Sequence, residues 1–133
     1  MSKTFELDII TPINTSSFMD VEYLRAPSIE GLFGVLPGHI SSIIALDIGE
    51  IKIIQGKETL RFSTSGGFAD IKKDKVILVL ETAEESDKIS IKRAQDSLDK
   101  SQKRLSDKSI DISRARISIQ KAKNRIAIAN KKN

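Results

Sequence analysis

Hydrophobic and polar residues alternate one by one through much of the first 80 positions of the chain. Phe5, Leu7 and Ile9 flank two acidic residues, and Val21 and Tyr23 flank a third. A period of two places successive side chains on opposite faces of an extended backbone. The pattern therefore predicts β-strands that each bury one face.

Short turn sequences separate these alternating segments. Gly56-Lys57, Ser65-Gly66-Gly67 and Lys73-Asp74 each stand between two runs, and the last run is the β-branched stretch from Lys75 to Leu80. Strands joined by such short turns pair as antiparallel hairpins. We expect about seven or eight short strands that close into a small sandwich or flattened barrel.

From Ser86 onward the hydrophobic period changes to steps of three and four, which is typical of amphipathic helices. The positions that follow this spacing hold large apolar or small residues: Ile91, Ala94, Leu98, Ser101 and Leu105, then Ile112, Ala115, Ile119, Ala122, Ile126 and Ala129. We expect two helices within residues 89–130, with Leu98, Ile119 and Ile126 on a shared or docking face.

A turn without Gly or Pro, Ser106-Asp107-Lys108-Ser109, is predicted between the two helices, so the connection is short and the helices are antiparallel. Large and small residues alternate along the seam, which predicts a thin hairpin. Two helices alone bury little apolar surface and are marginal in water. We therefore expect a conditionally stable unit that depends on the surface it packs against.

The sequence thus predicts an α+β protein, with an N-terminal antiparallel β-sandwich or flattened barrel over residues 1–86 and a C-terminal antiparallel two-helix hairpin over residues 87–133. Charge changes at the same point. Residues 1–86 hold 8 Lys/Arg against 13 Asp/Glu, a net charge of −5, whereas residues 87–133 hold 14 Lys/Arg against 5 Asp, a net charge of +9. Coincident changes of charge and period indicate a module boundary.

Composition removes several classes of protein. The 133 residues include no cysteine and one histidine, so we expect no disulfide, no thiolate nucleophile and no metal site. The longest apolar run, Val76 to Leu80, is far shorter than the roughly 20 residues that span a bilayer. The first residues lack the apolar region of a signal peptide, so we expect the protein to stay in the compartment where it is made.

Three glycines and a proline interrupt the apolar stretch EGLFGVLPGH. No Lys-Ser/Thr pair and no long helix follow, so a phosphate-binding loop is disfavoured. We expect Gly31, Gly34 and Gly38 to allow positive φ or close backbone approach, and Pro37 to form a turn between strands. His39 has no nucleophile that the sequence places near it, and we expect it to bond nearby backbone.

The carboxylates of the sequence are also not arranged as catalytic acids or bases. Glu84-Glu85 and the pair Asp70 and Asp74 lie in predicted turns without an apolar pocket that would separate their pKa values, and we interpret them as solvated charges. Ser65-Gly66-Gly67-Phe68 lacks the Gly-x-Ser-x-Gly spacing of a nucleophile elbow. We therefore expect no catalytic residues.

The helical hairpin is strongly basic, and its second helix carries Arg114, Lys121, Lys123 and Arg125. Nucleic acid, anionic lipid and acidic protein surfaces all attract such charge. The helices have no aromatic side chain for base stacking, and their apolar seam is committed to helix pairing. An acidic protein partner is favoured. A free-standing basic adaptor and, less favoured, a nucleic-acid-binding module remain open.

The order of these features resembles the epsilon subunit of bacterial and plastid ATP synthases. The resemblance rests on the loop EGLFGVLPGH, on Leu46 and Gly49, on Ser65-Gly66-Gly67-Phe68, on the run from Val76 to Leu80, and on AKNRI in the second helix. It covers essentially the whole chain.

This resemblance implies a non-catalytic subunit of the central stalk that couples ion-driven rotation to ATP synthesis. The sandwich would bind the gamma subunit and the membrane-embedded c-ring through Glu30, Gly31, Pro37, Gly38 and His39. The hairpin would either fold beside the sandwich or extend along gamma into the alpha/beta catalytic head, where it restrains ATP hydrolysis.

It also implies a peripheral protein on the cytoplasmic face of the bacterial inner membrane, associated with the membrane only through the complex and without a nucleic-acid partner. The basic residues Arg114, Lys121, Lys123 and Arg125 would face the acidic region of the catalytic beta subunits. We expect inhibition by that face to weaken with salt.

Some family members bind ATP between the sandwich and the folded hairpin through an Ile/Leu-Asp-x-x-Arg-Ala motif. The corresponding positions here run from Ile89 to Ala94. Arg93 matches the motif, and Lys121 and Arg125 supply second-helix charges similar to those of ATP-binding members. Ser90 replaces the Asp and removes a carboxylate acceptor. This change disfavours ATP as a regulatory ligand, and we expect no cofactor.

Overall fold

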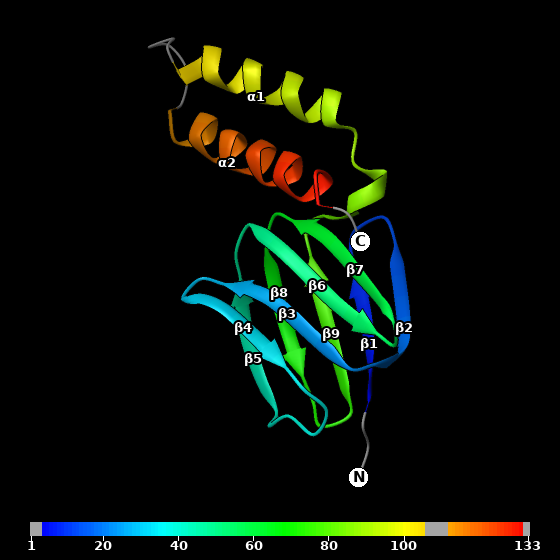
Figure 1. Cartoon of the computed structure of the whole chain (residues 1–133). Helices are drawn as coiled ribbons and strands as arrows, with labels where there is room; N and C mark the ends of the chain where they lie inside the picture. Colours follow the sequence, from blue (N-terminus) through cyan, green and yellow to red (C-terminus); the bar gives the residue numbers. More distant parts are fainter. Residues whose placement is uncertain (1–3, 106–111, 132–133) are drawn as a thin grey trace.

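The computed structural model describes residues 4–105 and 112–131, and it consists of a curled sheet with a pair of helices lying across one end (Figure 1). The strands are β1 (Phe5–Ile10), β2 (Thr15–Val21), β3 (Tyr23–Ser28), β4 (Gly31–Val35), β5 (Ser42–Leu46), β6 (Gly49–Gln55), β7 (Glu58–Thr64), β8 (Gly67–Ile71), β9 (Lys75–Leu80) and β10 (Ala83–Glu85). A short 3-10 helix, η1 (Ser86–Lys88), leads to α1 (Ile91–Leu105) and α2 (Ile112–Ala129).

The strands form one sheet in the order β10-β7-β6-β3-β5-β8-β9-β1-β2, with β4 also paired to β3. The sheet curls until β2 contacts β6. Phe18 of β2 meets Phe62 of β7 edge to face, with ring centroids 6.0 Å apart. Because the sheet curls in this way, β1, β3, β6, β8 and β9 turn buried side chains to its inside. The predicted sandwich or flattened barrel is confirmed.

One pairing departs from the antiparallel expectation. β1 and β9 run parallel, with Leu7 opposite Val76 and Ile9 opposite Leu78. Alternation has the same period of two in parallel and antiparallel strands, so the pattern alone does not distinguish them. The remaining strand pairs of the described residues are antiparallel.

The expected seven or eight strands are ten in the structure. The segment around Glu22, predicted as one strand, is two strands, because β2 ends at Val21 as the partner of β1, whereas β3 begins at Tyr23 as the partner of β6. The glycine-rich stretch holds β4 instead of a continuous loop. Ala83–Glu85 adds a short strand against β7.

The core lies inside the curled sheet and consists of sixteen apolar side chains from residues 5–80, with no residue of the hairpin among them. Leu7, Leu24, Ile51 and Leu78 are fully buried. Gly67, with a φ of 148°, lies where β8 and β9 come together, and a Cβ there would stand 2.0 Å from the carbonyl oxygen of Val79. The Ser-Gly-Gly-Phe turn therefore requires glycine at this position.

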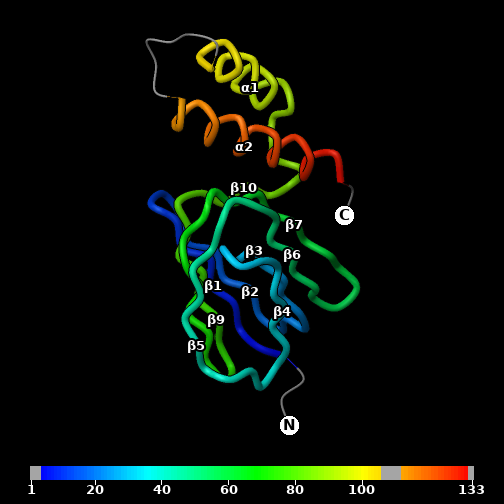
Figure 2. The backbone as a smooth tube through the Cα atoms, turned by 90° about the vertical axis from the view of Figure 1, so that its left-hand side faces the viewer, coloured from blue at the N-terminus to red at the C-terminus, as the bar shows by residue number. Residues whose placement is uncertain are grey.

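The two helices are antiparallel, and α2 lies between α1 and the sandwich (Figures 1 and 2). Leu98 is buried on the seam, as predicted, whereas Ile119 and Ile126 are half-buried. Small side chains fill the seam, where Ala94 and Ala115 are buried. The predicted thin helical hairpin is confirmed, and its predicted turn at residues 106–109 lies outside the described residues.

Candidate functional site

The junction between α2 and the sandwich is the most chemically organised surface of the described residues. α2 contacts β6, β7 and η1. Lys121, Asn124, Arg125 and Ile128 are spaced i, i+3, i+4 and i+7, so they share one stripe of α2. This stripe lies on a different side of the helix from the seam stripe of Ala115 and its successors. We call it the docking stripe.

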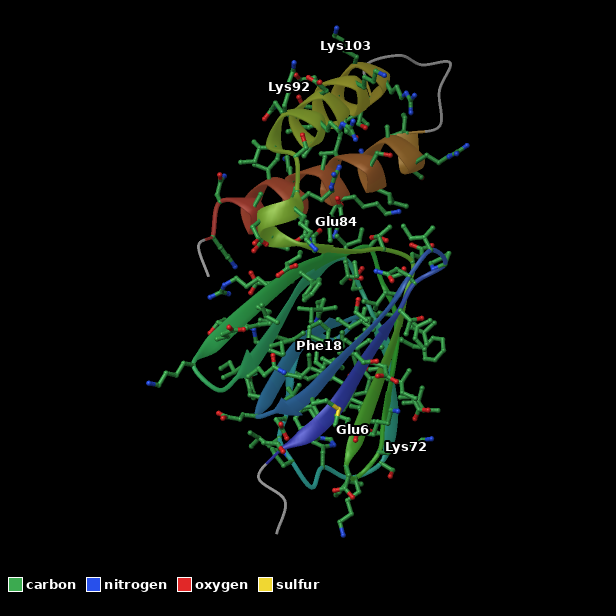
Figure 3. All side chains as sticks on the ribbon, turned by 90° about the vertical axis from the view of Figure 1, so that its right-hand side faces the viewer. Glu6, Phe18, Lys72, Glu84, Lys92 and Lys103 are labelled. Carbon is green, nitrogen blue, oxygen red and sulfur yellow. The ribbon has the colours of Figure 1, made fainter. Side chains whose placement is uncertain are left out.

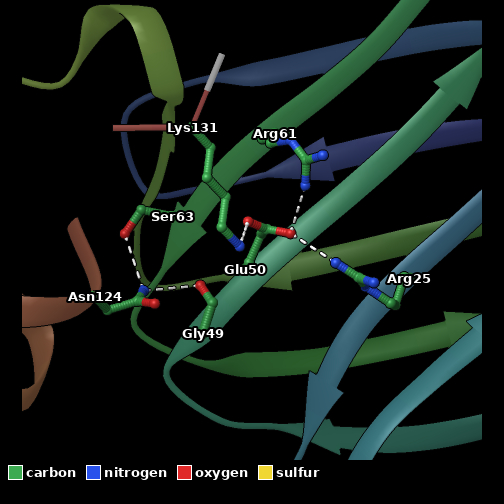
Figure 4. Close-up of polar contacts among 7 residues, drawn as sticks. All are labelled: Arg25, Gly49, Glu50, Arg61, Ser63, Asn124 and Lys131. Carbon is green, nitrogen blue, oxygen red and sulfur yellow. Dashed lines mark hydrogen bonds and ion pairs between the residues drawn. The ribbon is translucent and has the colours of Figure 1, made fainter. Parts of the chain in front are cut away.

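Asn124 ties the middle of the docking stripe to the sheet (Figure 4). Its Nδ2 donates to the carbonyl oxygen of Gly49 at 2.8 Å and to Oγ of Ser63 at 3.2 Å. The two acceptors lie on neighbouring strands, β6 and β7. One amide therefore fixes both the height and the rotation of α2 over the sheet.

An ion pair lies one residue further along α2. Arg125 Nη2 donates to Oε2 of Glu84 on β10 at 3.1 Å, and its Nε lies 2.6 Å from Oε1 without the alignment of a hydrogen bond. Lys121 is 4.0 Å from Glu81, at the outer limit of an ion pair. Because both side chains of the Arg125 pair are partly covered, that pair is the stronger of the two.

The end of the chain that the structure describes carries the third contact (Figure 4). Glu50 on β6 is only 8% exposed, and its Oε1 accepts from Arg25 at 2.8 Å and from Arg61 at 2.9 Å. Its Oε2 accepts from Lys131 Nζ at 2.6 Å. The two sandwich arginines thus orient the carboxylate, and the oxygen that faces the hairpin is left for Lys131.

These partners set the acidity of Glu50. Burial acts to raise the pKa of this carboxyl, but the hydrogen bond and charge of Lys131, the bond from Arg25 and the charge of Arg61 outweigh it. The pKa of Glu50 therefore lies below its ordinary value. The carboxylate is ionised at neutral pH and available as an acceptor.

Packing at this junction is incomplete. A cavity of about 240 Å³ lies between the helices and the sheet, lined on one side by Ser97, Ser118 and Lys121 and on the other by Thr82 and Glu84. Nine of the ten residues that line it have polar or charged side chains. The junction is therefore held by polar contacts more than by close apolar packing.

Sequence reasoning missed four residues of this junction: Glu50, Asn124, Ile128 and Lys131. Ile128 is 1% exposed, although it lies off the predicted seam. The i, i+3, i+4, i+7 spacing of the docking stripe was available in the sequence, but its mixture of one apolar and three polar residues has no hydropathy signal.

The structure divides the predicted basic face. Lys121 and Arg125 point to the sandwich, whereas Arg114 and Lys123 are exposed. A surface that presents all four cations to another protein therefore requires α2 to leave the sandwich.

The residues of the ATP-binding pattern are also separated. Ile89 is buried in the link before α1, and Arg93 is exposed on α1. Lys121 and Arg125 line the cavity, which Ile89 and Arg93 do not. Ser90 caps α1, because its Oγ accepts from the backbone N–H of Arg93 at 3.2 Å.

The predicted partner-binding residues occupy the two ends of β4. Glu30 and Gly31 lie at the β3–β4 turn, whereas Pro37, Gly38 and His39 lie in the β4–β5 loop at the sandwich end away from the helices (Figure 1). They therefore do not form one compact site.

The backbone expectations for this stretch hold. Gly31 and Gly38 have positive φ values of 128° and 79°. Gly34 approaches the ring of Tyr23 so closely that a Cβ would lie 2.8 Å from it. As predicted, His39 bonds nearby backbone, with Nδ1 2.8 Å from the carbonyl oxygen of Ile40.

Large apolar side chains are exposed around these two segments. We call them the apolar face: Ile29 (70% exposed), Leu32 (66%), Leu36 (61%), Ile40 (83%), Ile43 (75%) and Phe68 (44%). Ile29 and Ile43 line one shallow hollow, and Phe68 lies opposite Ala45 on the neighbouring strand. Large exposed apolar side chains on neighbouring strands and loops are typical of an interaction surface.

No helix in the described part of the chain is long and apolar enough to cross a membrane.

Comparison with known proteins identifies relatives along the full length of the chain. Residues 4–86 match the family described as ATP synthase, Delta/Epsilon chain, beta-sandwich domain. The ATP synthase epsilon chain of Desulforamulus reducens is 35% identical over 131 residues, which are 97% of this chain and 99% of that protein. The epsilon chain of Bacillus mycoides is 34% identical over 132 residues, 98% of this chain and 99% of the relative.

Solved structures share the fold. A chain of the Euglena gracilis mitochondrial ATP synthase, from a structure of OSCP, F1 and c-ring in rotational state 1, superposes with a TM-score of 0.83 at 18% identity and covers 96% of this chain and 82% of that one. A chain from the central stalk and c-ring of the Tetrahymena thermophila enzyme has a TM-score of 0.57 at 13% identity, with 96% of each chain covered. Because the family match covers the sandwich and the epsilon-chain relatives cover both modules, the chain belongs to the ATP synthase delta/epsilon family.

Proposed function

We propose that this chain is a rotor subunit of the central stalk of an F-type ATP synthase, where it couples ion-driven rotation to ATP synthesis without a catalytic site of its own. The observation that carries the proposal is the agreement with ATP synthase epsilon chains over 97% of this chain. That agreement includes the hairpin as well as the sandwich, so it concerns the whole arrangement and not one common module.

The sandwich is proposed to bind the gamma subunit and the c-ring. The apolar face supports this assignment, because six large side chains between 44% and 83% exposed favour burial against another protein. Glu30 and Gly31 follow Ile29 of this face in the chain, and Pro37, Gly38 and His39 lie between its members Leu36 and Ile40 in the β4–β5 loop.

The hairpin is proposed to restrain ATP hydrolysis by reaching the alpha/beta catalytic head. Arg114, Lys121, Lys123 and Arg125 would meet an acidic surface there. Two of these cations, Lys121 and Arg125, contact Glu81 and Glu84 of the sandwich in the present conformation. Contact with the head would therefore begin only after α2 has left the sandwich.

The chain would be a peripheral protein at the cytoplasmic face of a bacterial inner membrane, held there by the complex. We further propose that the hairpin docks without ATP. Arg125 already has a carboxylate partner in Glu84, and Ser90 supplies a helix cap where the ATP-binding pattern has Asp. Isothermal titration with MgATP then gives no saturable heat, and a clear binding isotherm would contradict this.

Reconstitution with purified gamma, alpha and beta subunits tests the function. The chain should co-purify with gamma, and Ile43→Asp together with Leu32→Asp should abolish that binding, whereas the matched control Lys57→Asp on the exposed β6–β7 turn should leave it intact. Deleting residues 87–133 should raise ATP hydrolysis while gamma binding persists.

The alternatives give different results. A free-standing adaptor would bind none of these subunits. A nucleic-acid-binding module would shift DNA or RNA in a mobility assay with steep salt dependence.

A further inference from the structure

Three cations form one row across the outer surface of the sandwich. Arg25 on β3 lies directly opposite Lys52 on β6, and Lys52 lies directly opposite Arg61 on β7. Directly opposed residues on neighbouring strands share a face of the sheet, with Cβ atoms about 5 Å apart. Ile51 and Ile53, on either side of Lys52 in the chain, are fully buried, so the three cations face outward. We call them the cation row.

The cation row is unusual for the module that carries it. Residues 1–86 have a net charge of −5 and only eight Lys/Arg, and three of these eight belong to the row. Like charges directly opposite each other destabilise a sheet. The row therefore opposes the folding of the sandwich, and a bound anion would relieve the repulsion.

One carboxylate of the chain meets the cation row without completing it (Figure 4). Glu50 precedes Lys52 by two residues on the same face of β6, and its Oε1 accepts from Arg25 Nη2 at 2.8 Å and from Arg61 Nη1 at 2.9 Å. Its Oε2 accepts from Lys131. Within the described residues, Nζ of Lys52 and the second terminal nitrogen of each guanidinium have no acceptor. The row keeps unused donors between its two arginines.

Tyr23 extends the cation row beyond β3. Arg25 lies opposite Gly34 on β4, and a Cβ at Gly34 would lie 2.8 Å from both Cε1 and Oη of Tyr23. The side chain of Tyr23 therefore takes the place next to Arg25 that a side chain at position 34 would occupy. Glycine at this position makes room for it, and the phenol adds a neutral donor beside the three cations.

The chemistry of the cation row fits carboxylates of a protein. Both guanidinium groups already bind one carboxylate, that of Glu50. Three cations meet only two or three anions, whereas nucleic-acid binding draws on many phosphate contacts and on free aromatic rings for stacking. The ring of Tyr23 is packed against Gly34 and is not free in this way.

The spacing of the cation row favours a helix. Carboxylates at i and i+4 of a helix have Cβ atoms about 5–6 Å apart, close to the spacing of about 5 Å between neighbouring cations. Same-face residues of an extended segment are about 6.6–6.8 Å apart, twice the rise of a strand residue. A helix that lies across β3, β6 and β7 therefore places its carboxylates beside successive cations.

We propose that Arg25, Lys52 and Arg61 form a docking surface for an acidic helix of a partner protein, whose carboxylates are bound by Lys52 and by the unbonded guanidinium nitrogens. No residue of the apolar face lies on β3, β6 or β7, so this surface is separate from it. The inference does not depend on the function proposed above.

A nuclear magnetic resonance titration of the nitrogen-15-labelled full-length chain tests the proposal. The probe is a helical peptide of Ala and Gln with Glu at positions i, i+4 and i+8. We expect saturable shifts of the backbone amides of Arg25, Lys52 and Arg61. The isomeric peptide with Glu at i, i+2 and i+4 has the same charge but turns its middle carboxylate to another side of the helix, so it should bind these residues more weakly.

Lys52 is the residue to change, because its ammonium group has no partner in the described structure and its removal leaves the bonds to Glu50 in place. Lys52→Gln should weaken binding at the cation row about two- to fivefold, Lys52→Glu should weaken it further, and Lys52→Arg should retain it. Lys72→Gln is the matched control, since Figure 3 shows Lys72 at the end of the sandwich away from the helices. It should change binding little.

The basic hairpin also attracts acidic peptides, but the amides of α1 and α2 report that binding separately. If the probe shifts only those amides, or if Lys52→Gln weakens binding at β3, β6 and β7 no more than Lys72→Gln does, the proposal is wrong. Equal binding of the two isomeric peptides would show general ionic attraction and would also overturn it. So would a DNA duplex or vesicles of phosphatidylglycerol that shift the cation row at lower concentration than the probe.

Discussion

The sandwich of this chain is held together mainly by apolar contacts, whereas the hairpin is attached to it mainly by polar contacts. The sandwich buries sixteen apolar residues in one closed core, with Leu7, Leu24, Ile51 and Leu78 fully covered. The hairpin buries few large side chains, mainly Leu98 and Ile128, and meets the sandwich through an amide and ion pairs.

The difference has a physical consequence. Apolar burial contributes about 1.5–3 kcal/mol for each large side chain and is insensitive to moderate salt. Exposed ion pairs contribute about 0.2–1 kcal/mol each and weaken as salt rises. One chain therefore joins a platform that stays folded to an element whose position responds to its surroundings. The four experiments below test this contrast.

Removing a side chain from the sandwich core should have the largest effect. Leu78→Ala leaves a cavity in the middle of β9 and should lower the free energy of unfolding by about 2–5 kcal/mol. Denaturant titration followed by circular dichroism measures it. Leu36→Ala, at a side chain 61% exposed, is the control and should change stability by less than about 0.5 kcal/mol. If Leu78→Ala and Leu36→Ala lower the free energy of unfolding equally, Leu78 is not part of the core.

The equivalent change in the hairpin should weaken docking and leave the sandwich stable. Ile128→Ala removes a side chain that is 1% exposed, and should destabilise the docked hairpin by about 2 kcal/mol. Hydrogen exchange should accelerate in α2 while β9 keeps its protection. Ile117→Ala, at a position 48% exposed on the same helix, should change neither. Acceleration in both modules together would indicate a single cooperative unit.

Deleting residues 87–133 should lower the stability of the sandwich by only about 1 kcal/mol, because it removes partly solvated polar partners from the sheet. The strand pairings and core remain complete without it. The thermal midpoint and the near-ultraviolet spectrum of the truncated chain measure the result. If the truncated chain precipitates, or if its near-ultraviolet spectrum shows that tertiary packing is lost, the predicted module boundary after residue 86 is wrong.

The smallest expected effect concerns the acidity of Glu50. Its pKa is lowered in the folded chain, so its contribution is fully present above the ordinary value of 4.5 and is lost as pH falls through the lower folded value. Lys131→Gln removes one hydrogen bond and one charge and should raise this pKa. Carbon-13 NMR titration of the Glu50 carboxyl measures the shift, and Lys123→Gln is the control. If the titration midpoint of Glu50 is unchanged in Lys131→Gln, Lys131 does not interact with Glu50.

Much of the fold could be predicted from the pattern of apolar and polar residues in the sequence. Alternation around Phe5, Leu7 and Ile9 predicted a strand, and the same three residues are buried in the core. The change of period after Ser86 predicted the hairpin, and the resemblance to epsilon chains agreed with the relatives found. The predicted strand count was wrong around Glu22, because β2 pairs with β1 and β3 pairs with β6, and the alternation of residues does not show where one strand ends and the next begins.

The junction was less predictable. Glu50 occupies a position that reads as an outward polar residue on an alternating strand, and it became a buried acceptor only because Arg25 and Arg61 come from neighbouring strands. Asn124 and Ile128 lie off the apolar seam, so no periodicity selects them. Their role depends on which side of α2 turns to the sheet.

The sequence by itself determined the two modules, their secondary structure, their opposite charge and the family, since period, charge and motif order are local properties of the chain. Tertiary structure alone decided the parallel pairing of β1 with β9, the closure of the sheet through β2 and the docking of α2. These depend on contacts between residues far apart in the chain, such as Asn124 with Gly49, 75 positions apart, and Lys131 with Glu50, 81 positions apart. A local pattern states which face of an element is apolar, but not which distant surface will meet the other faces.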